Sequence, residues 1–311
     1  MAGWIRRRQG EDRLPVTLAR RRLYILPTRT GAAFAALLLL MLIAGLNYAN
    51  SVALFLTFLL GAFALVVMQQ CHRNLLGLTV VSVSAPAVFA GTAGAVQVVL
   101  ASSATQRWRV EAGLDAAAPL VADLPAHARV RLELPLPAAR RGVVRIGRVR
   151  LSTAHPFGLF RAWTWVHTPL EMWVYPHPRG PLPMPLQGGR RRGRHAQPES
   201  GADEWSGLRP FRDGDSPRSV DWKAYAREAP LLVKEYSLEA SELRLFEFAQ
   251  LRHGDAEARL SQLARWVVDA EAQGERYGLV LPGVQLQPDR GPEHRHRCLI
   301  ALASYGLDHG H

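Results

Sequence analysis

Three aspartates in one short segment carry the clearest chemical potential in this sequence. Asp213, Asp215 and Asp221 lie close together, and Lys223 follows two positions after the last of them. Grouped carboxylates supply the oxygen ligands that hard divalent cations prefer, and a carboxylate beside an ammonium group can transfer protons. These residues therefore fit a metal-dependent hydrolase, or an acid–base pair made of Asp221 and Lys223.

The segment that carries these aspartates, residues 201–236, also fits a binding surface. Acids and bases interleave there with aromatic residues, as in ion-pair networks where arginines fork onto carboxylates. No histidine and no glycine-rich phosphate loop accompanies the aspartates. We therefore favour a segment that braces the fold or docks a partner protein over catalysis, and we assign no catalytic residue, metal or cofactor. The candidate binding residues are Arg209, Asp213, Asp215, Arg218, Asp221, Trp222, Lys223 and Arg227.

The net charge of +12 is concentrated in two other segments. Residues 1–29 hold eight arginines against two acids, and residues 178–200 hold five arginines against one acid. The remaining chain is close to neutral, whereas a DNA-binding domain usually presents a basic face. A nucleic-acid partner is therefore not expected. Contact with nucleic acid through residues 178–200 is a weaker alternative.

Two apolar runs near the N-terminus predict a membrane hairpin over residues 30–70. Residues 31–46 and 52–68 contain no charged side chain, and the link between them, residues 47–51, is uncharged too. Helices are expected because hydrocarbon offers no partner for backbone amides. Arginines precede the first run and follow the second, so the positive-inside rule places both termini and the soluble remainder in the cytoplasm, at the inner membrane. The low cysteine content fits such a reducing compartment.

The region after the hairpin, residues 74–177, changes to a strand pattern. Short runs of alternating apolar residues predict an antiparallel, immunoglobulin-like β-sandwich. Trp163, Trp165 and Trp173 are expected in its core. Residues 178–200, rich in proline, glycine and arginine, are expected to form a linker that could touch anionic lipid headgroups.

The C-terminal region, residues 240–311, alternates strand and helix patterns. Strands are predicted over residues 243–248 and 277–281, and helices over residues 255–272 and 292–305. This order implies a small α/β domain with a parallel pair of strands.

Three residues of metal-ligating types, two histidines and one cysteine, alternate on the second helix of this region. His294, His296 and Cys298 are spaced by two, so all three cannot share one helix face. A metal site there is therefore disfavoured. Gly274 is expected to end the first helix, because glycine readily adopts the left-handed conformation of a C-cap.

The charged segment resembles the signature of a bacterial membrane-protein family called domain of unknown function 58. The family pattern is L-R-x-[YF]-x-x-G-D-x-x-R-x-[IV]-D-W-K-x-x-A-R, and residues 208–227 read LRPFRDGDSPRSVDWKAYAR. Arg141 and Gly142, followed by the PFGLF run of residues 156–160, fit a second motif of that family. The two-helix start fits as well, so the resemblance covers nearly the whole chain.

The resemblance implies a β-sandwich joined to a von Willebrand factor A-like domain. It also implies an accessory role beside a MoxR-type AAA+ ATPase, because members are commonly encoded next to one. Von Willebrand A domains bind a cation through D-x-S-x-S, but the equivalent residues 247–251 read EFAQL. One carboxylate and no hydroxyl remain, so an ion site of that kind is not expected.

The expected fold class is a membrane-anchored α+β protein. It combines a two-helix transmembrane hairpin, an immunoglobulin-like sandwich and a small truncated α/β domain of von Willebrand A type. The expected function is a non-enzymatic scaffold or adaptor. Its expected partners are the lipid bilayer and a MoxR-type AAA+ ATPase or another membrane-associated protein, with no small-molecule substrate. A metal-dependent hydrolase that uses the aspartates is the alternative.

Overall fold

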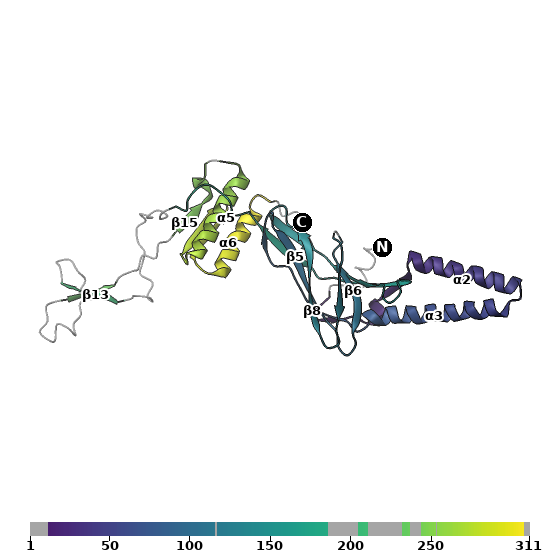
Figure 1. Ribbon diagram of the computed structural model, residues 1–311. Helices are drawn as coiled ribbons and strands as arrows, with labels where there is room; N and C mark the ends of the chain where they lie inside the picture. Colours follow the sequence, from purple (N-terminus) through teal and green to yellow (C-terminus); the bar gives the residue numbers. More distant parts are fainter. Residues whose placement is uncertain are drawn as a thin grey trace. The chain divides into compact units, whose positions relative to one another are not determined.

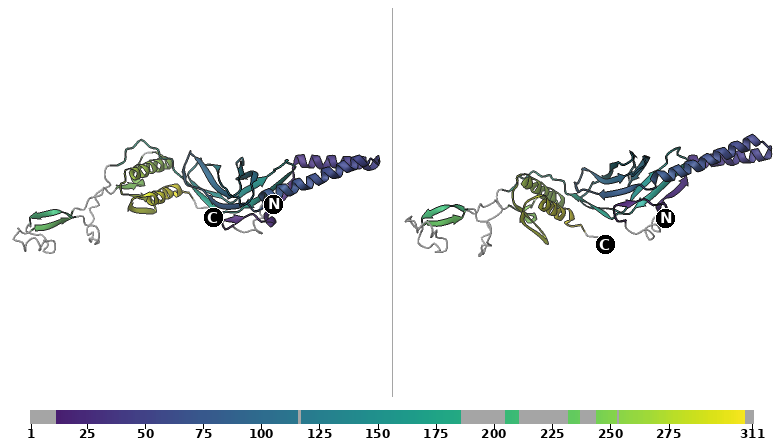
Figure 2. Two further views of the ribbon diagram at one scale, coloured as in Figure 1. Left: turned by 60° about the horizontal axis from the view of Figure 1, so that its bottom comes forward. Right: turned by 90° about the horizontal axis from the view of Figure 1, so that it is seen from below.

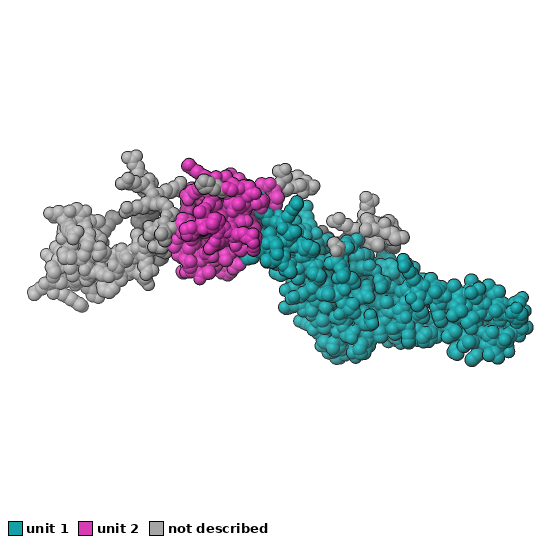
Figure 3. Space-filling view, turned by 45° about the horizontal axis from the view of Figure 1, so that its top comes forward, with its two compact units in different colours: residues 1–175 teal, residues 176–311 magenta. Residues whose placement is uncertain are grey.

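The computed structural model describes residues 12–115, 117–185, 244–252 and 254–307, and in backbone only residues 205–210 and 232–236. The chain divides into two compact units, residues 1–175 and residues 176–311, coloured separately in Figure 3. The first unit contains two long apolar helices and several mainly antiparallel sheets, and the second contains a small mixed α/β region. This arrangement confirms the mixed α+β class expected from the sequence.

The two apolar runs form two antiparallel helices, α2 (Arg29–Asn47) and α3 (Ser51–Leu75), which lie side by side in Figures 1 and 2. The Thr28 hydroxyl accepts a hydrogen bond from the Gly31 amide at the start of α2, and the Asn50 side chain caps α3 in the same way. At about 1.5 Å per residue the helices are about 28 and 37 Å long. Both are long and apolar enough to cross a membrane.

The basic N-terminal segment contributes strands to the sheets that follow the helices. Strand β1 (Val16–Thr17) pairs with β3, a 3-10 turn η1 (Arg20–Arg22) follows, and β2 (Tyr24–Pro27) pairs with β11. The chain therefore enters the β domain, leaves it through the hairpin and returns. The sequence predicted no strand there, because runs of two and four residues carry no readable periodicity.

Three sheets make up the β domain of the first unit. Their strand orders are β1-β3-β5-β8, β2-β11-β10-β6-β7 and β4-β12-β9, and only the β4–β12 pair is parallel among the paired strands described in this unit. The remaining strands are β3 (Thr79–Ser84), β4 (Val88–Phe89), β5 (Ala93–Ala101), β6 (Arg107–Gly113), β7 (Leu120–Leu124), β8 (Arg129–Pro137), β9 (Gly142–Ile146), β10 (Val149–Thr153), β11 (Phe160–Val166) and β12 (Leu170–Tyr175).

One hydrophobic core joins these sheets to the end of α3. On β5 the buried side chains are Val96, Val98 and Leu100, alternating with half-buried ones as a strand with one core face should. Cys71 and Leu75 of α3 lie in the same core cluster. The C-terminal end of α3 is therefore part of the domain's interior.

The prediction that the tryptophans fill this core was wrong. Trp163 and Trp165 are only half buried, and the buried positions on β11 belong to their smaller neighbours. Trp163 stacks on Tyr24 of β2 with ring centroids 5.9 Å apart, and the Arg148 guanidinium lies 4.0 Å from the Trp165 ring centroid. The outer face of this sheet is therefore covered by side chains of its own domain.

The second unit contains the parallel strand pair predicted from the sequence. Strands β15 (Arg244–Glu247) and β16 (Tyr277–Leu281) are parallel, and β17 (Val284–Asp289) adds an antiparallel edge strand. The helical elements are η3 (Phe248–Gln250), α5 (Ala256–Ala272) and α6 (Pro292–Ser304). Gly274 follows α5 with φ +69°, and its amide donates to the Glu271 carbonyl at 3.0 Å, which confirms the predicted C-cap.

The first residues of the predicted linker pack on α5. The Gln262 side chain pairs with both backbone groups of Leu182: the Leu182 amide donates to Oε1 at 3.0 Å, and Nε2 donates to the Leu182 carbonyl at 2.9 Å. The Trp266 indole donates to that carbonyl at 3.2 Å. A Cβ at Gly180 would overlap the Gln262 carboxamide. Residues 179–185 therefore form an arm of the second unit, whereas residues 186–200 lie outside the described chain.

Candidate functional site

The last turn of α3 is bonded directly to strand β6. The Asn74 Oδ1 accepts from the Trp108 amide at 3.0 Å, and Nδ2 donates to the Trp108 carbonyl at 2.6 Å and to the Thr153 hydroxyl at 2.9 Å. The Asn74 side chain is 8% exposed. A buried amide that satisfies both backbone groups of one residue acts as a short additional strand, so the helix direction is tied to the sheet.

The turn between β10 and β11 holds both apolar helices. The Thr28 amide and hydroxyl bond the carbonyls of Leu159 and Gly158 at 2.9 and 2.5 Å. Gly31 lies so close to Leu159 that a Cβ would overlap the Leu159 carbonyl oxygen. On the other side the Phe157 ring packs on Phe63 of α3, with centroids 5.2 Å apart. This turn, the PFGLF run of residues 156–160, therefore contacts both helices and the sheet. We call its contacts with Thr28, Gly31 and Phe63 the clamp.

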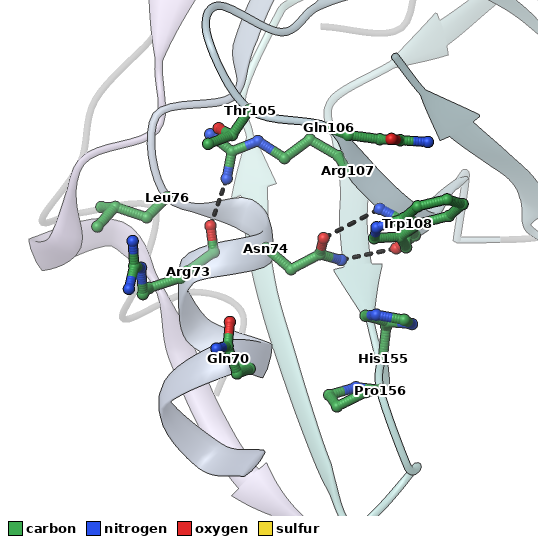
Figure 4. A pocket seen from close by; sticks show the side chains of 10 residues that line it. All are labelled: Gln70, Arg73, Asn74, Leu76, Thr105, Gln106, Arg107, Trp108, His155 and Pro156. Carbon is green, nitrogen blue, oxygen red and sulfur yellow. Dashed lines mark hydrogen bonds between the residues drawn. The ribbon is translucent and has the colours of Figure 1, made fainter. Parts of the chain in front are cut away.

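A pocket of about 550 Å³ lies at this junction. Figure 4 shows that its walls come from the end of α3, from β6 with the turn before it, and from the turn after β10. Donor side chains and aromatic rings line it, and none of the ten lining residues carries a carboxylate. The lining residues are Gln70, Arg73, Asn74, Leu76, Thr105, Gln106, Arg107, Trp108, His155 and Pro156.

Arg107 is the buried cation of the pocket. It is 5% exposed, its Nη1 donates to the Arg73 carbonyl, and its Nε donates to the Ser102 hydroxyl at 3.4 Å. Within the described residues no carboxylate pairs with it. Burial, and then the charge of Arg73, lower the pKa of this guanidinium below its ordinary value. The pocket therefore concentrates positive charge that the described part of the domain leaves unneutralised.

The chemistry available in the pocket is binding rather than proton transfer between two groups. His155 carries the one imidazole among its lining side chains. This ring stacks on Trp108 with centroids 6.2 Å apart. No second acid or base lies among the lining residues, which otherwise offer guanidinium, amide and hydroxyl donors.

The charged segment predicted as a binding surface lies largely outside the described residues. Arg209 falls on β13 (Trp205–Pro210), where its backbone pairs with Val233 of the antiparallel strand β14 (Leu232–Tyr236). The structure does not describe the other seven candidates, namely Asp213, Asp215, Arg218, Asp221, Trp222, Lys223 and Arg227. Their role as a binding surface or as metal ligands stays a prediction.

The described residues contain no group of three or more His, Cys, Asp or Glu side chains that could hold a metal ion. His294 and Cys298 are neighbours on the buried face of α6, with Nε2 and Sγ 3.5 Å apart, while His296 is exposed. His294 Nε2 lies 2.6 Å from the Tyr277 carbonyl oxygen. Burial raises the pKa of the Cys298 thiol to about 12, so the protonated, non-ligating form is favoured.

Residues 247–251, for which the sequence predicts no ion site, lie at the end of strand β15. Glu247 is half buried there, and Phe248 and Leu251 are buried on either side of Ala249. Phe248 contacts the Tyr305 ring with centroids 4.9 Å apart. Apolar packing therefore holds this end of the strand, while Ala249 is exposed.

Sequence could not point to the junction pocket, because its walls combine three segments far apart in the chain. Only the PFGLF run, noted as a family motif, gave a local signal. Comparisons with family models, with curated proteins and with solved structures find no match for this chain.

Proposed function

We propose that this protein is a membrane-anchored, non-enzymatic scaffold that holds a soluble body at the cytoplasmic face of the inner membrane. The exposure of α2 and α3 carries the proposal. Only 11% of each apolar helix window is buried within the molecule, so the large apolar side chains face outward. Water would make such a surface costly at about 25 cal/mol per Å². A bilayer about 30 Å thick removes that cost.

The charge pattern supports an orientation in which the start of α2, the end of α3 and the soluble body attached to them all lie in the cytoplasm. Arg20, Arg21, Arg22 and Arg29 precede or begin α2, and Arg73 lies at the end of α3. The link between the helices is uncharged. Arginines flanking membrane helices favour the cytoplasmic side.

The junction supports a scaffold rather than a loose tether. The hairpin joins the β domain without a flexible linker. The joining contacts are the hydrogen bonds of Asn74, the clamp contacts at Thr28 and Gly31, and the core packing of Cys71 and Leu75. A rigid anchor fixes the orientation of the domain relative to the bilayer, which a docking platform requires. We take this domain to be immunoglobulin-like, and the second unit to be a truncated von Willebrand A-like domain.

The proposed partner is a MoxR-type AAA+ ATPase or another membrane-associated protein, with the charged segment as its docking surface. The support is the match of residues 208–227 to the domain of unknown function 58 signature. Affinity capture from solubilised membranes tests it, with Asp215→Ala plus Arg218→Ala as the variant. Asp289→Ala plus Arg297→Ala removes an exposed ion pair of equal charge and is the control.

We expect the ATPase to be captured by wild type and by the control, and lost from the signature variant. Capture that is equal in all three proteins would exclude the signature as the docking surface. Metal analysis of the purified protein distinguishes the scaffold from the alternative, a metal-dependent hydrolase. The hydrolase requires a stoichiometric divalent metal in the wild type and its loss in Asp213→Ala.

Membrane insertion is tested separately by fractionation and by reporter fusions. We expect the protein to resist carbonate extraction, and a C-terminal green fluorescent protein fusion to fluoresce while an alkaline phosphatase fusion stays inactive. A fusion in the link at residues 48–50 should show the reverse. An active phosphatase at the C-terminus would overturn the proposed orientation.

A further inference from the structure

Arg107 is an uncompensated cation inside the domain. Burying a charge without a counter-charge costs several kcal/mol, and buried cations in proteins are normally paired. Its described partners are a carbonyl and a hydroxyl, both neutral, and its Nη2 has no acceptor among the described residues. Arg73 brings a second positive charge to the same pocket, and none of its lining residues is acidic. Such a site is completed by an anion from outside the chain.

The position of the pocket residues along α3, relative to the bilayer, indicates where that anion would come from. The apolar run of α3 ends at Met68, and Gln70 and Arg73 follow two and five residues later. At about 1.5 Å per residue they lie roughly 3 and 8 Å beyond the hydrocarbon edge. The polar headgroup layer on each side of a bilayer is about 5–8 Å thick. The helix wall of the pocket is therefore level with the lipid headgroups.

The turn after β10 places a second wall at the same level. Phe157 is 61% exposed, yet its ring packs on Phe63, which lies within the apolar run of α3. An exposed phenylalanine next to a membrane helix inserts into the acyl boundary. His155 and Pro156, which precede it, line the pocket. Lipid would therefore stand beside the pocket on this side.

We propose that the junction pocket binds the phosphate of an anionic phospholipid headgroup, with Arg73 and Arg107 as its ligands. The inference rests on the proposed membrane anchoring. Guanidinium groups match the geometry of phosphate oxygens, and the volume of about 550 Å³ is of the size that holds a small polar molecule. A zwitterionic headgroup would bring an ammonium group close to two arginines, so lipids of net negative charge are selected.

The test uses the full-length protein in nanodiscs of phosphatidylcholine alone or mixed with phosphatidylglycerol. Native mass spectrometry counts the lipids retained after release. The variants are Arg73→Gln, at an exposed side chain, and Arg107→Gln with Arg107→Lys as the conservative form. Arg131→Gln removes an equal charge from the exposed face of β8 and is the control. Thermal melting of each variant reports folding.

We expect wild type and Arg131→Gln to retain phosphatidylglycerol selectively, and Arg73→Gln to lose about tenfold or more of that preference. Arg107→Lys should keep part of it. Because Arg73 is exposed, its variant tests the site even if Arg107→Gln fails to fold. Equal retention of both lipids by wild type, or an equal loss in Arg131→Gln, overturns the proposal.

Inorganic phosphate separates the two sources of the ligand. We expect millimolar phosphate in detergent, without lipid, to leave the melting temperature unchanged. Stabilisation by phosphate that Arg73→Gln abolishes would show a soluble-anion site and overturn the lipid assignment. Failure to enter any nanodisc would instead overturn the membrane anchoring itself, so the two failures are distinguishable.

Discussion

The carboxamide of Asn74 makes both backbone hydrogen bonds of Trp108, at 3.0 and 2.6 Å, so a side chain at the end of α3 takes the place of a neighbouring strand. A third bond reaches the Thr153 hydroxyl at 2.9 Å. All these groups lie where the helix enters the β domain. These hydrogen bonds attach α3 rigidly to β6, and this rigid attachment is the structural basis of the scaffold proposal.

Replacement of this amide should therefore destabilise the whole first unit. Asn74→Ala removes the acceptor of the Trp108 amide and leaves the Trp108 carbonyl with the Thr153 hydroxyl at 3.4 Å, at a cost of about 1–3 kcal/mol. We expect the melting temperature of the detergent-solubilised protein to fall by on the order of 10 °C. Asn47→Ala, at an exposed asparagine in the last residue of α2, is the control and should leave it unchanged. Equal melting of the two variants would contradict the role given to Asn74.

Substitution by alanine should destabilise the protein at Gly31 but not at Gly61. Gly31→Ala places a methyl group against the Leu159 carbonyl, whereas a Cβ at Gly61 meets nothing within 4 Å. Overpacking of this kind costs about 1–3 kcal/mol. We expect Gly31→Ala to lower the melting temperature and to expose residues 154–159 to proteolysis. Gly61→Ala should do neither, and a loss of similar size there would refute the clamp.

Long apolar runs and the parallel pair of the second unit were readable from the sequence, because each rests on local periodicity. Strand β17 was missed since Pro288 lies within it, and proline is tolerated there only because β17 is the edge strand of its sheet. The short strands β1 and β2 were missed because their partners β3 and β11 lie beyond the hairpin. Only tertiary pairing defines them.

Alternation alone also misplaced the aromatic residues of β11. Alternation assigns the side chains of a strand to two faces, but it does not show which face packs against the core. The bulky residues can lie on either face. Here Ala162 and Val166 face it, while Trp163 and Trp165 are covered by Tyr24 and Arg148. The pocket was hidden for a similar reason. Arg73 and Arg107 become neighbours only through the junction.

The buried thiol of Cys298 should make the second unit sensitive to alkaline pH. Burial raises its pKa from 9.0 to about 12, and the nearby Arg297 charge opposes this only in part. A raised folded-state pKa contributes stability fully below pH 9, and that contribution is lost as pH rises towards 12. The loss amounts to at most about 1.4 kcal/mol per pH unit.

Melting of wild type and Cys298→Ala between pH 8 and 10.5 measures this contribution. We expect the wild-type melting temperature to fall more steeply above pH 9 than that of the variant. A Cys71→Ala protein, in which Cys298 is the one remaining cysteine, reports the accessibility of this thiol. The same Cys71→Ala protein should react with a maleimide at pH 8 only after unfolding. Rapid labelling of the folded protein would show that Cys298 is accessible, against its complete burial.

Gln262 repeats in the second unit the arrangement of Asn74 in the first, because its carboxamide bonds both backbone groups of Leu182. Gln262→Ala should release the arm over residues 179–185, since the remaining contacts there are single bonds such as that from the Arg179 amide to the Ser261 carbonyl at 3.2 Å. We expect faster trypsin cleavage after Arg179 and a fall in stability of about 1–3 kcal/mol. Gln285→Ala, at an exposed position of β17, should change neither. If cleavage after Arg179 is as fast in the control as in Gln262→Ala, the arm is not held by this side chain.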